Sequence, residues 1–298
     1  MITITGEHND AVVYAENVDE NCRNQIKQYL DHPLFAGTKV RIMPDVHFGK
    51  GSVVGFTATC NEYVVPSIVG VDIGCGVNAH DLGRGHVPFD KLDRYVRQNI
   101  PSGFEVNASI SDVLEEVYGR MFGNGIVLDE FKERVSALSE KVSVPVDRAF
   151  ASLGTLGGGN HFIEIDTDAN GGRWLLIHSG SRGFGARIAE YHQKIASRRT
   201  GDDSPIKFLF GVTANEYVDD MRTAQLYARV NRALMAFQIA CGFFKIAHDK
   251  FKEKAIESVH NYIDFEHGII RKGATNYAFS RELPIQSRYF ADPLLIEI

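Results

Sequence analysis

Hydrophobic residues recur along the chain at two different spacings, which predict a mixture of helices and strands. Apolar positions three and four residues apart predict helices over 89–101, 111–122 and 128–142. A further helix is predicted over 19–33, where His-Pro closes it. Short apolar runs bounded by glycine predict strands within 10–18, 39–60, 63–83 and 173–185. The pattern therefore indicates a mixed α/β (α+β) protein.

The longest helical signal runs from about 213 to 262. It opens with Thr213 and Glu216 at the spacing of a capping box, in which each side chain satisfies a free amide of the first turn. No internal repeat, low-complexity tract or long linker interrupts the chain. We therefore expect a single mixed domain.

Composition narrows the class of protein. The 298 residues are 44% hydrophobic and 23% charged, as in an ordinary folded protein, and no apolar run approaches the ~20 residues of a membrane helix. The net charge of −6 disfavours a general basic coat, so a nucleic acid would be held at one local site. The four cysteines show no disulfide or CxxC spacing, and the N-terminus has no secretory signal, so we expect a cytoplasmic protein with no membrane partner.

Candidate chemistry lies in polar residues that interrupt apolar, glycine-flanked runs. The run "SIVGVDIGCGV" (67–77) predicts a buried strand interrupted by Asp72 and Cys75, and the same context surrounds His161, His178 and His260. A bound cation would compensate a buried acid and thiol, and this ligand set suits Zn, Mn, Fe or Co. Any one of these residues alone is more often structural. Repetition of one context favours a joint metal site.

Phosphate binding is indicated by basic residues rather than by a standard loop. "FGKGS" lacks the Walker A pattern, because Pro44 replaces its first glycine and Gly51 follows Lys50, and "GTLGGGNHF" lacks the third glycine of a dinucleotide fingerprint. Arg182, Arg271 and Lys272 follow candidate ligands closely in sequence. We interpret them as phosphate contacts, with solvated surface charge as the alternative.

The sequence resembles the RtcB family of RNA ligases. The segments "PDVHFGKGSVVG", "GVDIGCGV", "GTLGGGNHFIEI", "HSGSRGFG" and "HNY…RKGAT" are similar to that family's motifs, in their usual order, between about residues 40 and 276. The resemblance implies an RtcB-like fold with a central metal-binding cleft. We assign residues 1–276 to this domain.

The resemblance also implies roles for individual residues. It implies that five side chains are ligands for two Mn ions: Asp72, Cys75, His161, His178 and His260. The Cys75 thiolate would bridge the two ions. It implies that guanylate and phosphate are bound by Asn160, Phe162 and Glu164. Arg182 and Lys272 would hold RNA or nucleotide phosphates, so that the implied catalytic set is Cys75, Asn160, Arg182 and Lys272. Asp45 and His47 would support the ligands.

The implied activity is joining of RNA 3′-phosphate or 2′,3′-cyclic phosphate ends to 5′-hydroxyl ends, with GTP and Mn, through guanylylated intermediates. The resemblance stops near residue 276, so we expect 277–298 to be a divergent tail without the family's guanylylated histidine. His248 and His267 do not match its context. Two alternatives stay open: a catalytically impaired protein that binds metal and RNA ends, and a metallohydrolase that opens cyclic phosphates.

Overall fold

The computed structural model describes most of the chain: residues 1–122, 127–201, 204–251, 255–264, 267–275, 282–284 and 295–297. Helices and strands are mixed throughout, which confirms the predicted class. Among the described residues, no helix combines the length and the apolar character needed to cross a bilayer.

The chain divides into two compact units, each assembled from separate stretches of sequence. Unit 1 contains residues 1–74, 185–224 and 259–275, and unit 2 contains residues 75–184, 225–258 and 276–298. The chain passes repeatedly from one unit to the other, so no single linker separates them. This explains why the sequence contains no recognisable linker.

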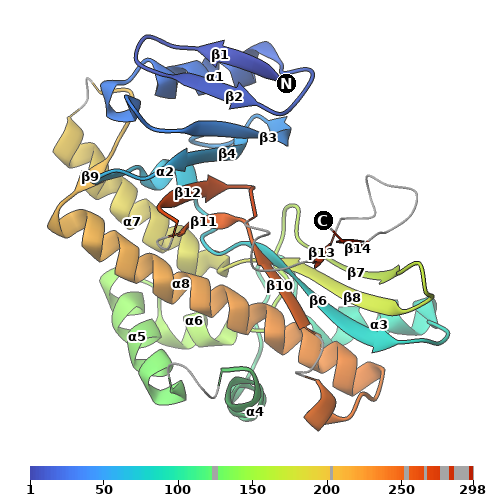
Figure 1. Ribbon diagram of the computed structural model, residues 1–298. Coiled ribbons are helices and arrows are strands. Elements are labelled where there is room, and N and C mark those ends of the chain that lie inside the picture. The colour runs from blue at the N-terminus through green and yellow to red at the C-terminus, as the bar shows by residue number, and fades with distance from the viewer. Residues whose placement is uncertain are drawn as a thin grey trace. The chain divides into compact units, whose positions relative to one another are not determined.

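Unit 1 is built on a six-stranded sheet (Figure 1). Its strands, in spatial order, are β1 (Ile2–Thr5), β2 (Asp10–Val13), β3 (Val40–His47), β4 (Val54–Thr59), β12 (Ile269–Lys272) and β11 (Asn261–Asp264). Only β2 and β3 pair in parallel. Helix α1 (Glu20–Leu30) begins where Asp19 accepts a hydrogen bond from the Cys22 amide, and it buries Ile26 and Leu30.

The segment between β4 and the second unit corrects one prediction. The expected strand over 67–77 is instead helix α2 (Pro66–Val69), a turn, and only then strand β6 (Gly76–Gly83). Gly74 has a φ of 73°, a conformation that glycine adopts readily, which allows the chain to turn there. Asp72 therefore lies in a turn and not in a strand.

Unit 1 also contains three short elements: η1 (Pro33–Phe35), β5 (Tyr63–Val64) and β9 (Leu209–Phe210).

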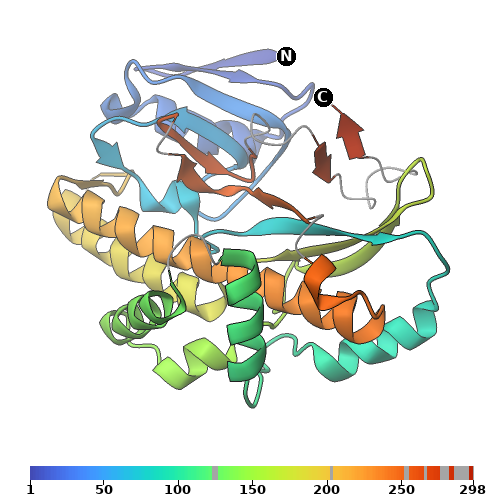
Figure 2. The ribbon, with the colours of Figure 1, turned by 60° about the horizontal axis from the view of Figure 1, so that its bottom comes forward.

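Unit 2 is built on a four-stranded sheet with the order β10 (Ala255–Val259), β6, β8 (Arg173–Ser179) and β7 (Phe162–Thr167) (Figure 2). Val77, Ala79, Phe162 and Leu176 form one hydrophobic cluster of this sheet. The predicted helices are confirmed as α3 (Phe89–Asn99), α4 (Ser111–Phe122) and α5 (Leu128–Lys141), and α6 (Val146–Ala151) follows. In the predicted tail, β13 (Glu282–Pro284) pairs with β14 (Leu295–Glu297), and the rest of 276–298 lies outside the described residues.

Two long helices, α7 (Arg182–Thr200) and α8 (Val212–Phe237), contribute residues to both units. The predicted helix over 213–262 is wrong beyond Phe237, where a π-helix, η2 (Gln238–Phe243), a 3-10 turn, η3 (His248–Lys250), and strands β10 and β11 follow. The capping-box prediction is also wrong. Thr213 lies within α8, and its hydroxyl donates to the Phe210 carbonyl.

Candidate metal site

Strand register brings three of the predicted ligands together in unit 2. Strands β6 and β7 both pair antiparallel with β8, the first through Gly76 opposite Ser179 and the second through Phe162 opposite His178. Cys75 and His161 directly precede Gly76 and Phe162 in sequence. Both residues therefore enter the sheet beside the C-terminal end of β8, where His178 lies.

The three side chains converge on one small volume. The Cys75 Sγ atom lies 3.2 Å from His178 Nε2 and 3.7 Å from His161 Nε2. Cys75 and His178 are each 3% exposed, and His161 is half-buried. The structure thus brings these three predicted residues together within unit 2, and their role as metal ligands stays a prediction.

Backbone carbonyls fix the orientation of both imidazoles. His178 Nδ1 lies 3.1 Å from the Asn160 carbonyl oxygen, and His161 Nδ1 lies 2.9 Å from that of Leu156. A carbonyl only accepts, so each Nδ1 carries a hydrogen, and each Nε2 is directed at the Cys75 sulfur. Arg182 Nη1 is 3.5 Å from His161 Nδ1, but a guanidinium only donates, and the shorter carbonyl contact decides the tautomer.

These donor types are ones that hold divalent transition-metal ions. Two imidazole Nε2 atoms face one sulfur. Imidazole and thiolate are ligands of Zn, Mn, Fe and Co, and a metal-bound histidine usually donates its other N–H to a carbonyl or carboxylate, as both histidines do here. The side chains in unit 2 are therefore of a kind and arrangement that could take part in holding a metal ion.

Asp72 and His260 lie in unit 1, where Asn261 anchors the segments that carry them. Asn261 Nδ2 donates to the Asp72 carbonyl over 3.1 Å, and its Oδ1 accepts from the Gly273 amide over 2.9 Å. The His260 carbonyl accepts from the Ala274 amide over 3.1 Å. Both predicted ligands are half-buried. Their membership of the ligand set stays a prediction.

Arg182 lies beside the site at the start of α7. Its Nε donates to Thr155 Oγ1 over 3.1 Å and its Nη2 to the Gly103 carbonyl over 3.3 Å. The guanidinium packs against Gly157 so closely that a Cβ there would lie 1.7 Å from Nη1. Arg182 also has a φ of 58°, a strained conformation for a residue with a side chain. The fold thus holds this cation against the loop that carries His161.

Of the three predicted guanylate-binding residues, Asn160 and Phe162 contact His178, and Glu164 lies further along β7. Asn160 is exposed and contributes the carbonyl that binds His178 Nδ1. Phe162 is buried with its ring centroid 5.2 Å from that of His178. Glu164 is half-buried in β7 opposite Leu176. Their binding of guanylate stays a prediction.

Lys272 and Arg271 make contacts within unit 1. Lys272 Nζ donates to the carbonyls of Lys50 (2.6 Å) and Ser52 (2.8 Å), which anchors the glycine-rich loop before β4. Arg271 forms an ion pair with Asp264 at 3.6 Å. These contacts give both residues a structural role, and phosphate binding by Lys272 stays a prediction.

The remaining histidines singled out from the sequence have acidic neighbours. His47 Nδ1 lies 2.9 Å from the carbonyl oxygen of Asp45, and both side chains are largely exposed. His248 lies 2.7 Å from a Glu116 carboxylate oxygen, in η3 and not on the long helix as predicted. Support of the metal ligands by Asp45 and His47 stays a prediction.

Burial lowers the pKa of Lys272 from its ordinary value to about 8. Between pH 8 and about 10.5 the folded state binds fewer protons here than the unfolded state, so this group makes stability rise with pH in that window. We expect the free energy of unfolding of the parent protein, relative to Lys272→Met, to rise by about 2–3 kcal/mol across it in urea titrations. The exposed control Lys194→Met should follow the parent protein, and parallel curves for parent and Lys272→Met would contradict the prediction.

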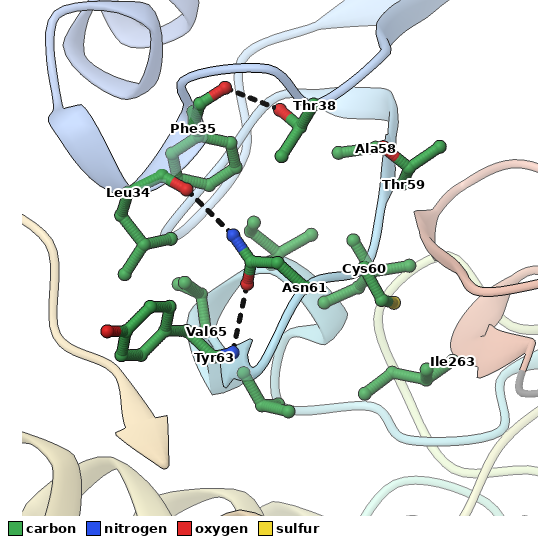
Figure 3. Close-up of a pocket in the computed structure, with 13 residues that line it drawn as sticks. Leu34, Phe35, Thr38, Ala58, Thr59, Cys60, Asn61, Tyr63, Val65 and Ile263 are labelled. Carbon is green, nitrogen blue, oxygen red and sulfur yellow. Dashed lines mark hydrogen bonds between the residues drawn. The ribbon is translucent and has the colours of Figure 1, made fainter.

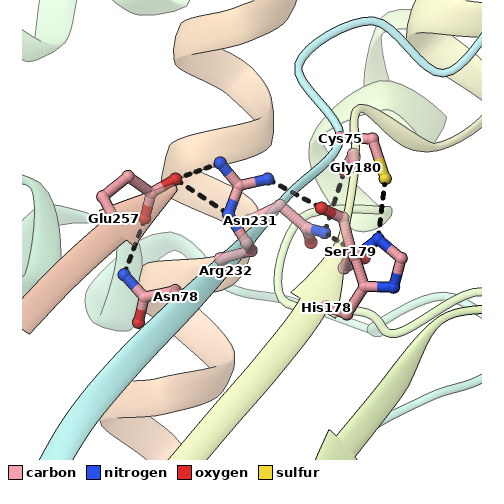
Figure 4. A network of polar contacts seen from close by, with 8 residues as sticks. All are labelled: Cys75, Asn78, His178, Ser179, Gly180, Asn231, Arg232 and Glu257. Carbon is pink, nitrogen blue, oxygen red and sulfur yellow. Dashed lines mark hydrogen bonds and ion pairs between the residues drawn. The ribbon is translucent and has the colours of Figure 1, made fainter. Parts of the chain in front are cut away.

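Sequence reasoning missed a buried polar network behind His178 (Figure 4). Arg232 Nη1 donates to the Ser179 carbonyl over 2.7 Å, and its Nε donates to Glu257 Oε1 over 2.9 Å. Asn78 Nδ2 donates to the second carboxylate oxygen of Glu257 over 2.7 Å. One feature of the sequence could have indicated this network: the polar pair Asn231-Arg232 lies between the apolar residues Val230 and Ala233 of α8.

A separate cavity in unit 1 has a largely apolar lining (Figure 3). Asn61 closes part of its wall, donating to the Leu34 carbonyl over 2.8 Å and accepting from the Tyr63 amide over 2.9 Å. Burial and the charge of Asp264 raise the pKa of the Cys60 thiol to about 11. That thiol therefore stays protonated, and we assign the cavity no part in the chemistry.

Comparison with known proteins places the chain in a family. The family described as "tRNA-splicing ligase RtcB" matches residues 25–297, so the chain belongs to the RtcB family. The match includes most of 277–298, for which the sequence motifs showed no resemblance.

Individual relatives agree with this assignment. The chain is 30% identical to RNA-splicing ligase RtcB1 of an Escherichia coli strain over 272 residues, covering 84% of this chain and 65% of the relative. It is 30% identical to RNA-splicing ligase RtcB of E. coli K12 over 288 residues, covering 87% and 69% respectively. For tRNA-splicing ligase RtcB of Nanoarchaeum equitans the identity is 28% over 317 residues, covering 86% and 66%. The chain thus spans about two thirds of the length of these relatives.

Proposed function

We propose that this protein is an RNA ligase that joins RNA 3′-phosphate or 2′,3′-cyclic phosphate ends to 5′-hydroxyl ends. It uses GTP and two Mn ions and works through guanylylated intermediates. The observation that carries the proposal is the convergence of the His161 and His178 Nε2 atoms on the Cys75 sulfur. Family membership supports RNA ligation as the reaction.

In this proposal Cys75, His161 and His178 hold the metal ions, and Asp72 and His260 complete the ligand set. The Cys75 thiolate would supply negative charge to the metal ions. Bound divalent ions would supply positive charge to stabilise the charge that develops on a reacting phosphate. The fixed orientation of both imidazoles favours metal binding, because each Nε2 already faces the Cys75 sulfur.

Residues around the metal ligands would bind the substrates. Arg182 presents a planar guanidinium beside His161, and such a group recognises phosphate oxygens through paired hydrogen bonds. Asn160 is exposed and its backbone carbonyl binds His178 Nδ1, so its side chain is accessible to a guanylate beside the metal ligands. We assign RNA or nucleotide phosphate to Arg182 and Lys272. All four cysteines are free, as suits the reducing cytoplasm.

Two assays on the same preparation test this function. With Mn and GTP, intact-mass spectrometry should show addition of one GMP, and a 3′-phosphate or cyclic-phosphate RNA should join a 5′-hydroxyl RNA. Replacing GTP by ATP, or chelating the metal, should abolish both signals. Absence of adduct and joined product would overturn the proposal. RNA-end binding without an adduct would then identify an inactive binder, and opening of cyclic phosphate without GTP would identify a hydrolase.

A further inference from the structure

Both imidazoles of the candidate metal site depend on one buried side chain of α8. We infer that Asn231 is a positioning residue that holds His161 and His178 in the Nδ1–H tautomer, with each Nε2 directed at Cys75. The inference rests on the proposed function only where it predicts metal affinity. Its structural part concerns the protein without metal.

Asn231 connects the two segments that carry these histidines. Its side chain is fully buried, and its Oδ1 accepts from the Thr155 amide over 3.1 Å. Its Nδ2 lies 3.1 Å from the Thr155 carbonyl oxygen, 3.1 Å from Ser179 Oγ and 3.2 Å from the Gly180 carbonyl oxygen. One amide group thus binds the loop before His161 and the turn after His178. Figure 4 shows the contacts with the turn.

Ser179 extends this contact to His161. Its hydroxyl accepts from Asn231, so its single hydrogen is directed to the Leu156 carbonyl, 2.9 Å away. The same carbonyl accepts the Nδ1 hydrogen of His161 over 2.9 Å. Asn231, Ser179 and Leu156 therefore form a continuous path of hydrogen bonds that ends on one of the imidazoles.

The path to His178 runs through the backbone. His178 directly precedes Ser179, whose side chain binds Asn231 and whose carbonyl binds Arg232. The Nδ1 of His178 donates to the Asn160 carbonyl, in the loop that Asn231 fixes at Thr155. Loss of Asn231 would free both ends of this contact, because Thr155 and Gly180 would each lose a buried hydrogen-bond partner.

Removing such support usually weakens metal binding. Substituting a group that orients a metal-ligating histidine typically lowers metal affinity by about 10–100-fold. We expect a loss in this range for Asn231→Ala. Ser179→Ala removes only the hydroxyl relay, so it should weaken binding less and should disturb His161 more than His178.

The test begins with the metal-free protein. Long-range 1H–15N NMR of the histidine rings reports which nitrogen carries the hydrogen. The parent protein should show the Nδ1–H form for His161 and His178, whereas Asn231→Ala should show a mixture of tautomers at both. Leu138→Ala, a core truncation in α5, is the matched control: it should lower stability by about 2–5 kcal/mol and leave both tautomers unchanged.

Co2+ titration of the same proteins provides the second readout. Asn231→Ala should bind about 10–100-fold more weakly than Leu138→Ala, and if Asn231→Ala does not fold, Ser179→Ala answers the question. Unchanged tautomers together with affinity within twofold of the parent would overturn the inference. A parent protein that binds no Co2+ would instead contradict the proposed metal site, and the tautomer comparison would still decide the role of Asn231.

Discussion

Replacing Cys75 with alanine is expected to lower the affinity for Mn2+ or Co2+ by more than about 100-fold and to abolish binding of a second ion. The sulfur lies within 3.7 Å of both imidazole Nε2 atoms, so it is the common centre of the donor set. A bridging thiolate contributes negative charge to both ions, and alanine supplies none. Equilibrium dialysis with metal analysis measures affinity and stoichiometry together.

Cys241→Ala is the matched control for this experiment. Cys241 is also buried and lies in η2 of the same unit, but burial raises its pKa to about 11, so it stays a neutral thiol. We expect its loss to leave metal binding unchanged. If Cys75→Ala also retained full stoichiometry and lost only about 1–3 kcal/mol of stability, Cys75 would be a structural residue.

The second large effect is expected from Glu257→Gln. Arg232 is fully buried, and Glu257 is the carboxylate that receives its Nε and Nη2 hydrogens. Removing this negative charge breaks the ion pair that the buried guanidinium forms with Glu257, and breaking a buried ion pair typically destabilises a protein by about 3–5 kcal/mol. Urea unfolding monitored by circular dichroism should show the loss as a lower midpoint with an unchanged slope.

The double variant Arg232→Met/Glu257→Leu separates charge burial from packing. Replacing both partners with apolar residues removes the desolvation penalty, so stability should return to within about 2 kcal/mol of the parent protein. The Ser179 carbonyl still loses its Arg232 donor, which accounts for an incomplete return. If the free energy of unfolding of Glu257→Gln alone were within about 1 kcal/mol of that of the parent protein, the ion pair would contribute little to stability.

The convergence of Cys75, His161 and His178 could be predicted from sequence for a definite physical reason. Each residue interrupts an apolar, glycine-flanked run, and such interruptions are costly unless a partner compensates them. His178 lies in β8, and Cys75 and His161 directly precede the two strands that pair with β8, so the three residues meet at one end of the sheet. The polar interruptions could therefore be recognised in the local sequence, whereas the pairing register of β6, β7 and β8 could not.

The failures arose where distant contacts override local preference. The segment 255–264 looked helical from its spacing, but residues 255–259 form β10 beside β6, and residues 261–264 form β11 beside β12. Asn231 and Arg232 were missed because their partners include Thr155 and Ser179, 76 and 53 positions away respectively. A buried polar residue within a helix cannot be distinguished from an exposed one until those partners are known.

X-ray absorption spectroscopy of the Mn- or Co-loaded protein tests the central claim most directly. The metal's scattering shell should contain one sulfur and at least two imidazole nitrogens, and the sulfur contribution should vanish in Cys75→Ala. The same spectrum for the parent protein and Cys75→Ala, with a shell of oxygen atoms alone, would show that the metal binds elsewhere and would contradict the account.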